Sequence, residues 1–454
     1  MIRQRLSSII VFVLILLYAF SLSARQGGLH FINKSHLLSL AEKVYFEHDS
    51  VYVIDIYSDY PTYRSVEAKG EGFACVDDAA RAIVFLVNYD KLAQTKEDSA
   101  LITGLARFLL KMQTSDGRFY NFVERIGGKV VVNRTGITSQ ASFGWWAARA
   151  IWGLGTAAVY FKKNDRTLYS AVVNSLNKTK HPLDSVLSEF GKVNASGCPT
   201  WLIYGDGADV SSELLLGLNE AYRATKDLFY LTSSEKIAQG LLRMQRGKCD
   251  KFPFSVFMSN RFEWHAWANS QSAALLDLYR INFDPHLLNA ALREVNCFLP
   301  RWTGALFFRG FHIDSTRINY NGQIAYNIRP ALMAAVEAYR ITRIAKYKTL
   351  SLLISSWFFG NNTAKVVMYS KETGICFDGI EDSLKINRNS GAESTIEALY
   401  SMLLLNKAGI TNVDVKSISK PSLNAGNFTY SINGRKLELM IAENGFRVSV
   451  LRAR

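Results

Sequence analysis

Two adjacent aspartates, Asp77 and Asp78, lie in the stretch CVDDAARA, whose other residues are mostly small and apolar. An aspartate in the first turn of a helix accepts orphan backbone N–H groups and favours the positive end of the helix dipole. One aspartate suffices for that role. We therefore expect one of the two to cap a helix and the other to face a cleft as an acid or base.

Glu393, in the stretch NSGAEST, is the candidate partner of this aspartate pair. Cleavage of a glycosidic bond needs two carboxyl groups, of which one protonates the leaving oxygen and the other activates water or attacks the sugar. Glu393 also fits a capping acid in a first helical turn. Asp77, Asp78 and Glu393 are thus the catalytic candidates.

Aromatic, amide and charged side chains near the expected helix starts are candidates for binding a sugar. Indole rings stack on the C–H faces of sugars while polar neighbours read the hydroxyl groups. The densest strip is FEWHAWANSQ, residues 262 to 271, although any single tryptophan also fits a packed core. The candidates are Arg118, Asn121, Gln140, Trp145, Asp209, Trp264, His265, Trp267 and Asp378.

Other kinds of catalytic site have no support in the sequence. It contains no GxSxG, Walker A or HExxH motif. The five cysteines form no CxxC pair and have no zinc-type spacing, so we expect neither a metal nor a cofactor. In an oxidising compartment one or two disulfides can form, and the odd count leaves at least one free thiol.

Six segments rich in Ala, Gly, Ser and Leu recur about 60 residues apart and alternate with amphipathic segments. A helix that is apolar nearly all round is buried on both sides, whereas an amphipathic one covers the outside. The pattern predicts an all-α fold, an (α/α)6 toroid, over residues 35–407. The buried segments begin at CVDDAARAI, SQASFGWWA, ADVSSELLL, WANSQSAAL, GQIAYNIRP and SGAESTIEA.

The loops that follow the amphipathic segments contain Gly with Asp or an aromatic residue. In a toroid these loops share the rim at which the inner helices begin. We therefore expect the loops around Asp116, Gly304 and Asp378 to open at the same end of the barrel as Asp77, where one cleft would collect their side chains.

The two ends of the chain differ from this pattern. Residues 1–24 join basic residues to an apolar run and then to small residues, which is typical of a secretory signal peptide. An uncleaved anchor is the alternative. At the other end, residues 408–426 resemble a linker, and residues 427–454 predict a small β appendage with a hairpin turn at Asn433–Gly434.

The formal charge of +14 suits an anionic partner, but the basic residues are scattered. No nucleic-acid module is recognisable, so nucleic acid is not expected as a partner. The charge is compatible with binding to acidic glycans or to an anionic cell surface, and also with a role in solubility alone. The expected partner is an oligo- or polysaccharide, with an acidic one as an alternative.

Four motifs, CVDDAARA, DGRFYNFV, ASFGWWAARAIWGLG and NRNSGAESTIEAL, resemble those of a bacterial six-hairpin glycosidase-like family. The resemblance spans about residues 35 to 407 and implies an (α/α)6 barrel whose enzymes more often invert than retain. Where related sequences have an acid, this chain has Gln140 or Ser142 instead, so Asp77, Asp78 and Glu393 become the stronger catalytic candidates.

The sequence therefore predicts an exported glycoside hydrolase, periplasmic or extracellular, with no stable membrane insertion after signal cleavage. A polysaccharide lyase or uronate-processing enzyme, with a Tyr or His as base, is one alternative. A protein that binds glycans without catalysis on the same scaffold is the other.

Overall fold

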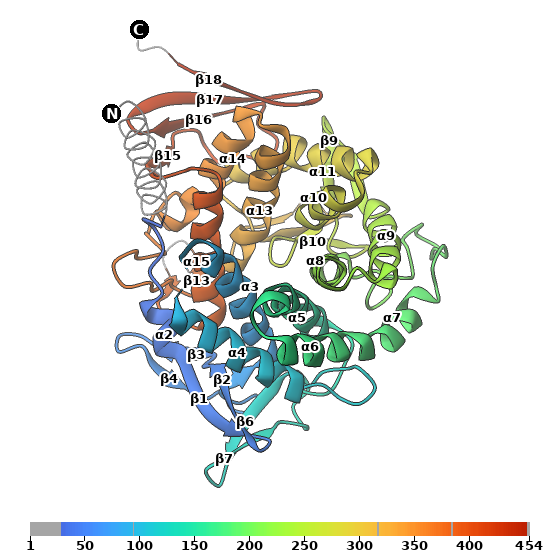
Figure 1. The fold of residues 1–454 in the computed structure, drawn as a ribbon. Helices are drawn as coiled ribbons and strands as arrows, with labels where there is room; N and C mark the ends of the chain where they lie inside the picture. The colour runs from blue at the N-terminus through green and yellow to red at the C-terminus, as the bar shows by residue number, and fades with distance from the viewer. Residues whose placement is uncertain (1–28, 94, 316, 383–384, 452–454) are drawn as a thin grey trace, which may run out of the picture.

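The computed structural model describes residues 29–93, 95–315, 317–382 and 385–451, so the predicted signal peptide lies outside the described residues. Six helices form a closed inner ring in which each packs on the next and the last packs on the first (Figure 1). They coincide with the six segments predicted to be buried, which confirms the (α/α)6 toroid. These helices are α3 (Val76–Ala93), α5 (Trp145–Asn164), α8 (Ala208–Thr225), α10 (Gln271–Asn282), α13 (Ala325–Thr342) and α15 (Ala392–Lys407).

Each outer helix packs mainly against one inner helix, and several also contact the next inner helix of the ring. Five of them directly follow their inner partner in the chain, whereas the sixth, α2, comes from the start of the described chain and packs on α15. Three shorter helices, α7 (Lys180–Leu187), α12 (Leu299–Gly304) and the 3-10 turn η1 (Ser356–Phe358), lie between them. The outer helices are α2 (Ser35–Leu40), α4 (Lys96–Lys111), α6 (Arg166–Lys178), α9 (Leu228–Leu242), α11 (Pro285–Cys297) and α14 (Ala345–Ser355).

The small residues of the inner helices allow their backbones to approach closely. A Cβ atom on Gly217 of α8 would lie 2.6 Å from the backbone N of Trp152 on α5. A Cβ on Gly153 would lie 2.9 Å from the Cα of Ala80 on α3. Because neither neighbour is the end of a flexible side chain, glycine is required at both contacts. This close packing explains the glycine-rich pattern of the predicted inner segments.

Short antiparallel sheets occupy the loops, where the sequence shows few alternating patterns. They form four two-stranded hairpins and two three-stranded sheets, and the C-terminal sheet is described below. The strands are β1 (Ala41–Phe46), β2 (Asp49–Ile54), β3 (Tyr57–Asp59), β4 (Arg64–Val66), β5 (Ala74–Cys75), β6 (Phe122–Ile126), β7 (Lys129–Val132), β8 (Gln245–Lys248), β9 (Lys251–Phe257), β10 (Glu263–His265), β11 (Gly310–His312), β12 (Ile318–Asn319), β13 (Gly379–Asp382) and β14 (Lys385–Asn387).

The C-terminal appendage is a four-stranded antiparallel sheet beside α14, at one edge of the barrel (Figure 1). It consists of β15 (Val415–Ser417), β16 (Asn427–Ile432), β17 (Arg435–Ala442) and β18 (Gly445–Val450) in sequence order. Asn433 and Gly434, both with positive φ, form the predicted turn between β16 and β17. The stretch expected to be a linker differs from the expectation, because it contains β15, which pairs with β16.

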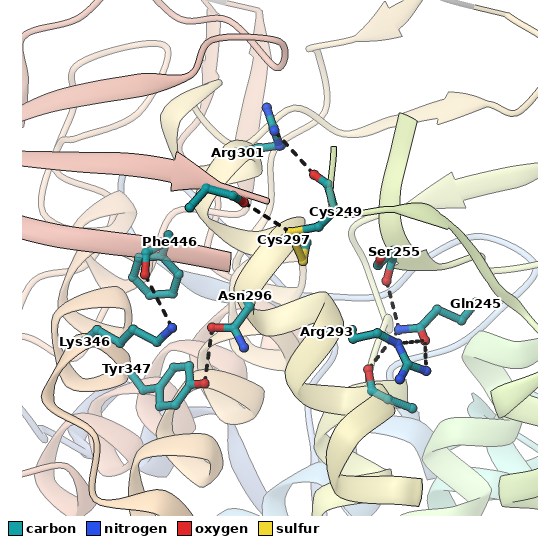
Figure 2. The surroundings of a disulfide bond; sticks show 12 residues. Gln245, Cys249, Ser255, Arg293, Asn296, Cys297, Arg301, Lys346, Tyr347 and Phe446 are labelled. Atoms are coloured by element: carbon teal, nitrogen blue, oxygen red, sulfur yellow. Dashed lines mark hydrogen bonds between the residues drawn. A yellow bond between two sulfur atoms is a disulfide. The ribbon is translucent and has the colours of Figure 1, made fainter. Parts of the chain in front are cut away.

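One disulfide, Cys249–Cys297, joins the turn between β8 and β9 to the end of α11 (Figure 2). Beside it, Arg301 donates a hydrogen bond to the carbonyl of Cys249, and Lys346 on α14 donates one to the carbonyl of Phe446 on β18. The disulfide thus lies where the barrel and the appended sheet meet. The other three cysteines, Cys75, Cys198 and Cys376, are free and buried.

Within the described part of the chain, the helices all fall short of the length and apolarity that crossing a bilayer demands.

Glu294 on α11 is a buried carboxyl group that accepts hydrogen bonds from two neutral donors. It accepts hydrogen bonds from the backbone N of Phe257 (2.8 Å) and the hydroxyl of Ser272 (2.6 Å). Burial raises the pKa of Glu294 to about 7, against these two hydrogen bonds that lower it. The protonated form therefore contributes stability that is fully present below the ordinary glutamate pKa and is lost as the pH rises through about 7.

We expect Glu294→Gln to remove this loss, because the amide stays neutral and can still accept from Phe257 and bond Ser272. Relative to the parent, the variant gains up to roughly 3 kcal/mol of unfolding free energy between about pH 4.5 and pH 7. Chemical denaturation at pH 5 and at pH 8 checks this. An equal stability difference at the two pH values would contradict it.

Candidate active site

The starts of the inner helices surround two adjoining hollows at one end of the barrel. The acidic pocket, about 380 Å³, opens over the first turns of α3, α13 and α15 and is lined by Asp77, Asp78, Arg81, Arg149, Gln323, Asp378, Glu381 and Glu393, among others. The aromatic groove, about 1280 Å³, opens over α5 and α8 and is lined by Trp145, Tyr204, Asp209, Phe262, His265, Trp267, Arg309 and His312, among others.

Asp77 reaches the acidic pocket from the first turn of α3. Its Oδ1 lies 2.9 Å from Nη1 of Arg149 on α5, and its Oδ2 accepts a hydrogen bond of 3.3 Å from the side-chain amide of Asn121. The side chain keeps 16% of its surface exposed. Asp77 is thus held on two sides while part of it stays accessible to a ligand.

Asp78 lies deeper, with 2% of its surface exposed. Its Oδ1 accepts a hydrogen bond from Nη1 of Arg81 (2.7 Å), and its Oδ2 accepts one from the thiol of Cys75 (3.2 Å). Burial raises the pKa of Asp78, and the charge of Arg81 opposes that rise. These contacts give Asp78 a role in holding Arg81 rather than in contacting a substrate.

The prediction that one aspartate caps α3 is wrong. The backbone N–H of Asp78 donates to Sγ of Cys75 (3.4 Å), and that of Asp77 donates to Oδ1 of Asn121 (3.4 Å). The backbone N–H of Val76 donates to the carbonyl of Asn121 (2.8 Å). A thiol and an asparagine from the loop after α4 therefore satisfy the helix start, which leaves both carboxylates for ion pairs.

Arg81 links the first inner helix to the last. Its Nη2 lies 2.7 Å from Oε2 of Glu393, and its Nε lies 3.3 Å from Oε1 of Glu397, both on α15. Glu393 keeps 41% of its side chain exposed, whereas Glu397 is buried. Because Arg81 also holds Asp78, one guanidinium joins three carboxylates and closes the ring at the floor of the acidic pocket.

The ion-pair network continues along the barrel axis below the pocket. Arg329 on α13 lies 2.6 Å from Glu397 and 3.2 Å from Glu213 on α8. It also donates to the hydroxyl of Ser270, the N-cap residue of α10, and this hydroxyl donates to Glu213. Burial opposes the charge of Arg329, but Glu397 and Glu213 outweigh it and raise its pKa. All six inner helices thus contribute to one polar network.

Tyr326 on α13 lies at the centre of this network. Its hydroxyl accepts a hydrogen bond of 3.0 Å from Nη2 of Arg149. The guanidinium carbons of Arg81, Arg149 and Arg329 lie 4.7, 5.2 and 5.2 Å from its ring centroid. Such cation–π contacts stabilise arginines that are removed from water. Tyr326 therefore helps to fix the two arginines that hold Asp77 and Glu393.

Asp378 forms the wall of the acidic pocket beside α15. Its Oδ1 accepts hydrogen bonds from the backbone N of Gly391 (2.8 Å) and the hydroxyl of Ser394 (2.6 Å). Burial raises the pKa of Asp378, and the negative charge of Glu393 raises it further, against these two hydrogen bonds. Both donors use the same oxygen, so Oδ2 is the atom that can carry a proton. Its place in the pocket confirms that its loop opens at the end of the barrel where Asp77 lies.

The aromatic groove contains a histidine and aspartate in contact. Nε2 of His265 lies 3.0 Å from Oδ2 of Asp209, and Nδ1 lies 3.0 Å from the carbonyl oxygen of Trp267. The rings of His265 and Trp267 are stacked, with centroids 4.0 Å apart. Trp145, at the start of α5, packs on Trp267 at 5.2 Å. The structure therefore brings four of the predicted sugar-binding residues together.

Three other predicted residues line neither hollow, and a fourth, Trp264, borders the groove while its side chain packs in the core. Arg118 is exposed and pairs with Asp116, and Gln140 is exposed five residues before α5 begins. Asn121 is buried and holds Asp77. The side chain of Trp264 points into the core because strand alternation places it opposite the face that carries His265, and it packs on Phe298, Trp302, Phe308 and Phe311.

Gly304, expected at the rim, lies instead under the appended sheet, where a Cβ atom would lie 2.2 Å from the ring of Phe428. The loop around Asp116 continues into Asn121, whose side chain contacts Asp77.

Sequence reasoning missed the arginines and the tyrosine of the network. Arg81, Arg149 and Arg329 each stand in a helix that is otherwise almost entirely apolar and buried. A charged residue in such a segment must find a partner inside the barrel, because an unpaired buried charge is too costly. The spacing of Arg81 three residues after Asp78, with which it pairs, carried part of this signal.

Among the described residues, no group of three His, Cys, Asp or Glu side chains is arranged to hold a metal ion.

Comparison with known proteins gives matches of structure only: no family model and no curated protein matches the sequence. The fold is similar to that of cellobiose 2-epimerase from Bacillus thermoamylovorans B4167 (TM-score 0.58, 11% identity, 84% of this chain and 99% of that chain). It is similar to a D-mannose isomerase (TM-score 0.55, 11% identity, 85% and 97%). A third match is a family 76 glycoside hydrolase from a bovine Bacteroides thetaiotaomicron strain (TM-score 0.53, 12% identity, 85% and 77%).

At these identities the similarity shows the fold alone. The proteins that share this fold include both hydrolases and epimerases that act on sugars. The (α/α)6 barrel implied by the four sequence motifs is confirmed at that level, because the chain shares this fold with these structures.

Proposed function

We propose that the protein is a glycoside hydrolase that cleaves its substrate in the acidic pocket. The observation that carries this proposal is the contrast between two carboxyl groups in one small pocket. Asp77 is ion-paired with Arg149, whereas the pKa of Asp378 is raised by burial and by Glu393. Carboxyl groups whose environments differ in this way are suited to opposite proton-transfer roles.

In this mechanism Asp378 is the general acid, because its free Oδ2 can deliver a proton to the leaving oxygen. Asp77, which lines the same pocket, is the base that activates water. Glu393 holds Arg81 and keeps negative charge beside Asp378, which favours the protonated acid. Asp78 is a positioning residue, since it acts through Arg81.

We also propose that the protein is exported to the periplasm or beyond. The Cys249–Cys297 bridge supports this proposal, because disulfides form and persist in oxidising compartments. The composition of residues 1–24 agrees with it.

A second candidate function has its support in the aromatic groove. It holds two side chains of the types that remove protons, His265 and Asp209, in contact with each other, and removal of a proton from a sugar carbon is the first step of a lyase or an epimerase. A lyase acting on uronates would need spare positive charge for the substrate carboxylate. The aromatic groove is lined by as many acidic side chains as arginines, and the two arginines of the acidic pocket are already ion-paired, so neither hollow has an excess of positive charge and a neutral sugar is favoured.

Product analysis of the purified protein on a glycan panel tests the proposed function. Release of reducing ends without ultraviolet absorbance supports hydrolysis. Absorbance from an unsaturated uronate would contradict the hydrolase and indicate a lyase. Conversion of a sugar without cleavage would contradict the hydrolase and indicate an epimerase. Binding without any turnover would leave a glycan-binding protein.

A further inference from the structure

The aromatic groove is continuous with the acidic pocket through a chain of contacts. Arg149, which holds Asp77 in the pocket, has its guanidinium carbon 5.0 Å from the ring centroid of Trp145. Trp145 packs on Trp267, and Trp267 stacks on His265 in the groove. A ligand that occupies the pocket can therefore extend over these rings without leaving the protein surface.

The floor of the groove is one face of the sheet formed by β10, β11 and β12. Residues paired across these strands share a face, and the residues of one strand alternate between faces. The buried face carries Trp264, Phe311 and Ile318. The other face carries polar side chains around Gly310, and these are Glu263, His265, His312 and Asn319.

Stacked pairs of rings lie at two places along this floor. His265 stacks on Trp267 with an interplanar angle of 10°, and His312 stacks on Phe262 with the same angle and a centroid distance of 5.7 Å. Arg261 covers the ring of Phe262 at 4.6 Å. Pairs of fixed rings next to hydrogen-bonding side chains provide the combination of apolar faces and polar contacts that sugar rings need.

The volume of the aromatic groove and the charges that line it indicate which class of ligand it can bind. The groove, at about 1280 Å³, exceeds the acidic pocket of about 380 Å³, which has the size of a site for one small ligand. Its lining residues include three acids, Asp206, Asp209 and Glu263, and three arginines, Arg261, Arg309 and Arg317. This balance gives no net attraction for an anionic chain.

We propose that the aromatic groove binds the neutral sugar residues of an oligosaccharide whose scissile bond lies in the acidic pocket. This inference rests on the proposed hydrolase function for the position of the bond, but the groove itself binds sugars whether or not cleavage follows. The substrate is thus a chain of several uncharged sugars rather than a mono- or disaccharide, and the overall charge of +14 plays no part in its recognition.

Binding measured without turnover tests the groove separately from the chemistry. The protein for this test is the Asp77→Asn variant, and the probes are manno-, cello- and xylo-oligosaccharides of one to six sugars, with oligogalacturonides of the same lengths as the acidic set. Calorimetry is expected to show that affinity in one neutral series rises with chain length beyond two sugars. The oligogalacturonides are expected to bind at least tenfold more weakly.

Two further substitutions locate the bound chain. Trp267→Ala and His312→Ala, each added to Asp77→Asn, are expected to weaken binding of the longest neutral probe by roughly tenfold or more while leaving the single sugar unaffected. His312 is exposed, so its variant keeps the fold even where Trp267→Ala does not. The matched control is Tyr45→Ala, an exposed aromatic residue on β1 that does not line either hollow.

The outcomes separate the two proposals. Length-dependent binding that His312→Ala abolishes, together with no cleavage by the parent, upholds the groove and overturns the hydrolase. Cleavage with the same kcat/KM for all chain lengths overturns the groove and upholds the hydrolase. Absence of binding by every neutral series, or tighter binding of oligogalacturonides, also overturns the groove proposal.

Discussion

Asp77→Asn is expected to lower the turnover of a cleaved glycan by at least ~100-fold, because an amide cannot accept the proton of the attacking water. The change keeps the size of the side chain and its contact with Asn121. The loss should be the same for natural glycans and for nitrophenyl glycosides, since both need the base. Steady-state kinetics on the two kinds of substrate measure it.

Asp378→Asn, the companion variant, is expected to behave differently. It should lower turnover of a natural glycan by at least ~100-fold but cost much less on a nitrophenyl glycoside, whose leaving group departs without protonation. The parent should also lose activity at high pH as Asp378 loses its proton, and Glu393→Gln should move that loss to lower pH because the neighbouring charge that raises the pKa of Asp378 is gone. Equal losses on both substrates would show that Asp378 is not the acid.

Asp78→Asn is the matched control for this series. Its side chain is buried against Arg81 and Cys75, so the variant is expected to lose roughly 3 kcal/mol of unfolding free energy and to keep more activity than Asp77→Asn. Thermal melting and kinetics on the same preparations separate the two effects. Full turnover by both Asp77→Asn and Asp378→Asn would refute the proposed site.

The second large effect is expected at the Cys249–Cys297 bridge. Replacing both cysteines by serine opens a loop that spans 48 residues, which the chain-entropy model values at roughly 4 kcal/mol of unfolding free energy. Because the bridge lies where the barrel meets the appended sheet (Figure 2), part of the loss should appear as early exposure of that sheet to proteolysis. Denaturant unfolding of the double variant measures the total.

Reducing agent provides the control for this prediction. It should lower the stability of the parent towards that of the Cys249→Ser, Cys297→Ser variant and leave the variant unchanged. The three free cysteines are buried and cannot substitute for the missing bridge in the native state. A variant as stable as the oxidised parent would contradict the prediction.

Much of the fold could be predicted because its signals are local. The small, apolar composition of each inner segment and the amphipathic pattern of each outer one depend on residues that are neighbours in the chain. The turn at Asn433–Gly434 is similarly local. Ten of the fourteen strands described outside the C-terminal sheet have only two to four residues, and these were missed because they are too brief to show an alternating pattern.

The candidate site could be predicted only in part. Carboxylates at helix starts indicated Asp77 and Glu393, and a glycine-containing loop indicated Asp378, but their functional states depend on residues far away in the chain. Arg149 holds Asp77, and Arg81 holds Glu393 across 312 positions of sequence. The burial of Trp264 depended on a three-stranded sheet that the sequence did not indicate. These contacts and this burial exist only in the closed ring of helices, so the sequence of a single segment does not predict them.

The packing of α2 on α15 has a consequence for synthesis of the chain. Because α2 packs on α15, it cannot make this contact until α15 has been synthesised. During translation the inner ring is therefore open, and the side of α3 that will contact α15 stays uncovered. Asp77 leaves the ribosome more than three hundred residues before Glu393 and Asp378. Contacts of such long range form late. In the proposed hydrolase, catalysis therefore begins only after the ring of inner helices has closed, and incomplete chains are inactive.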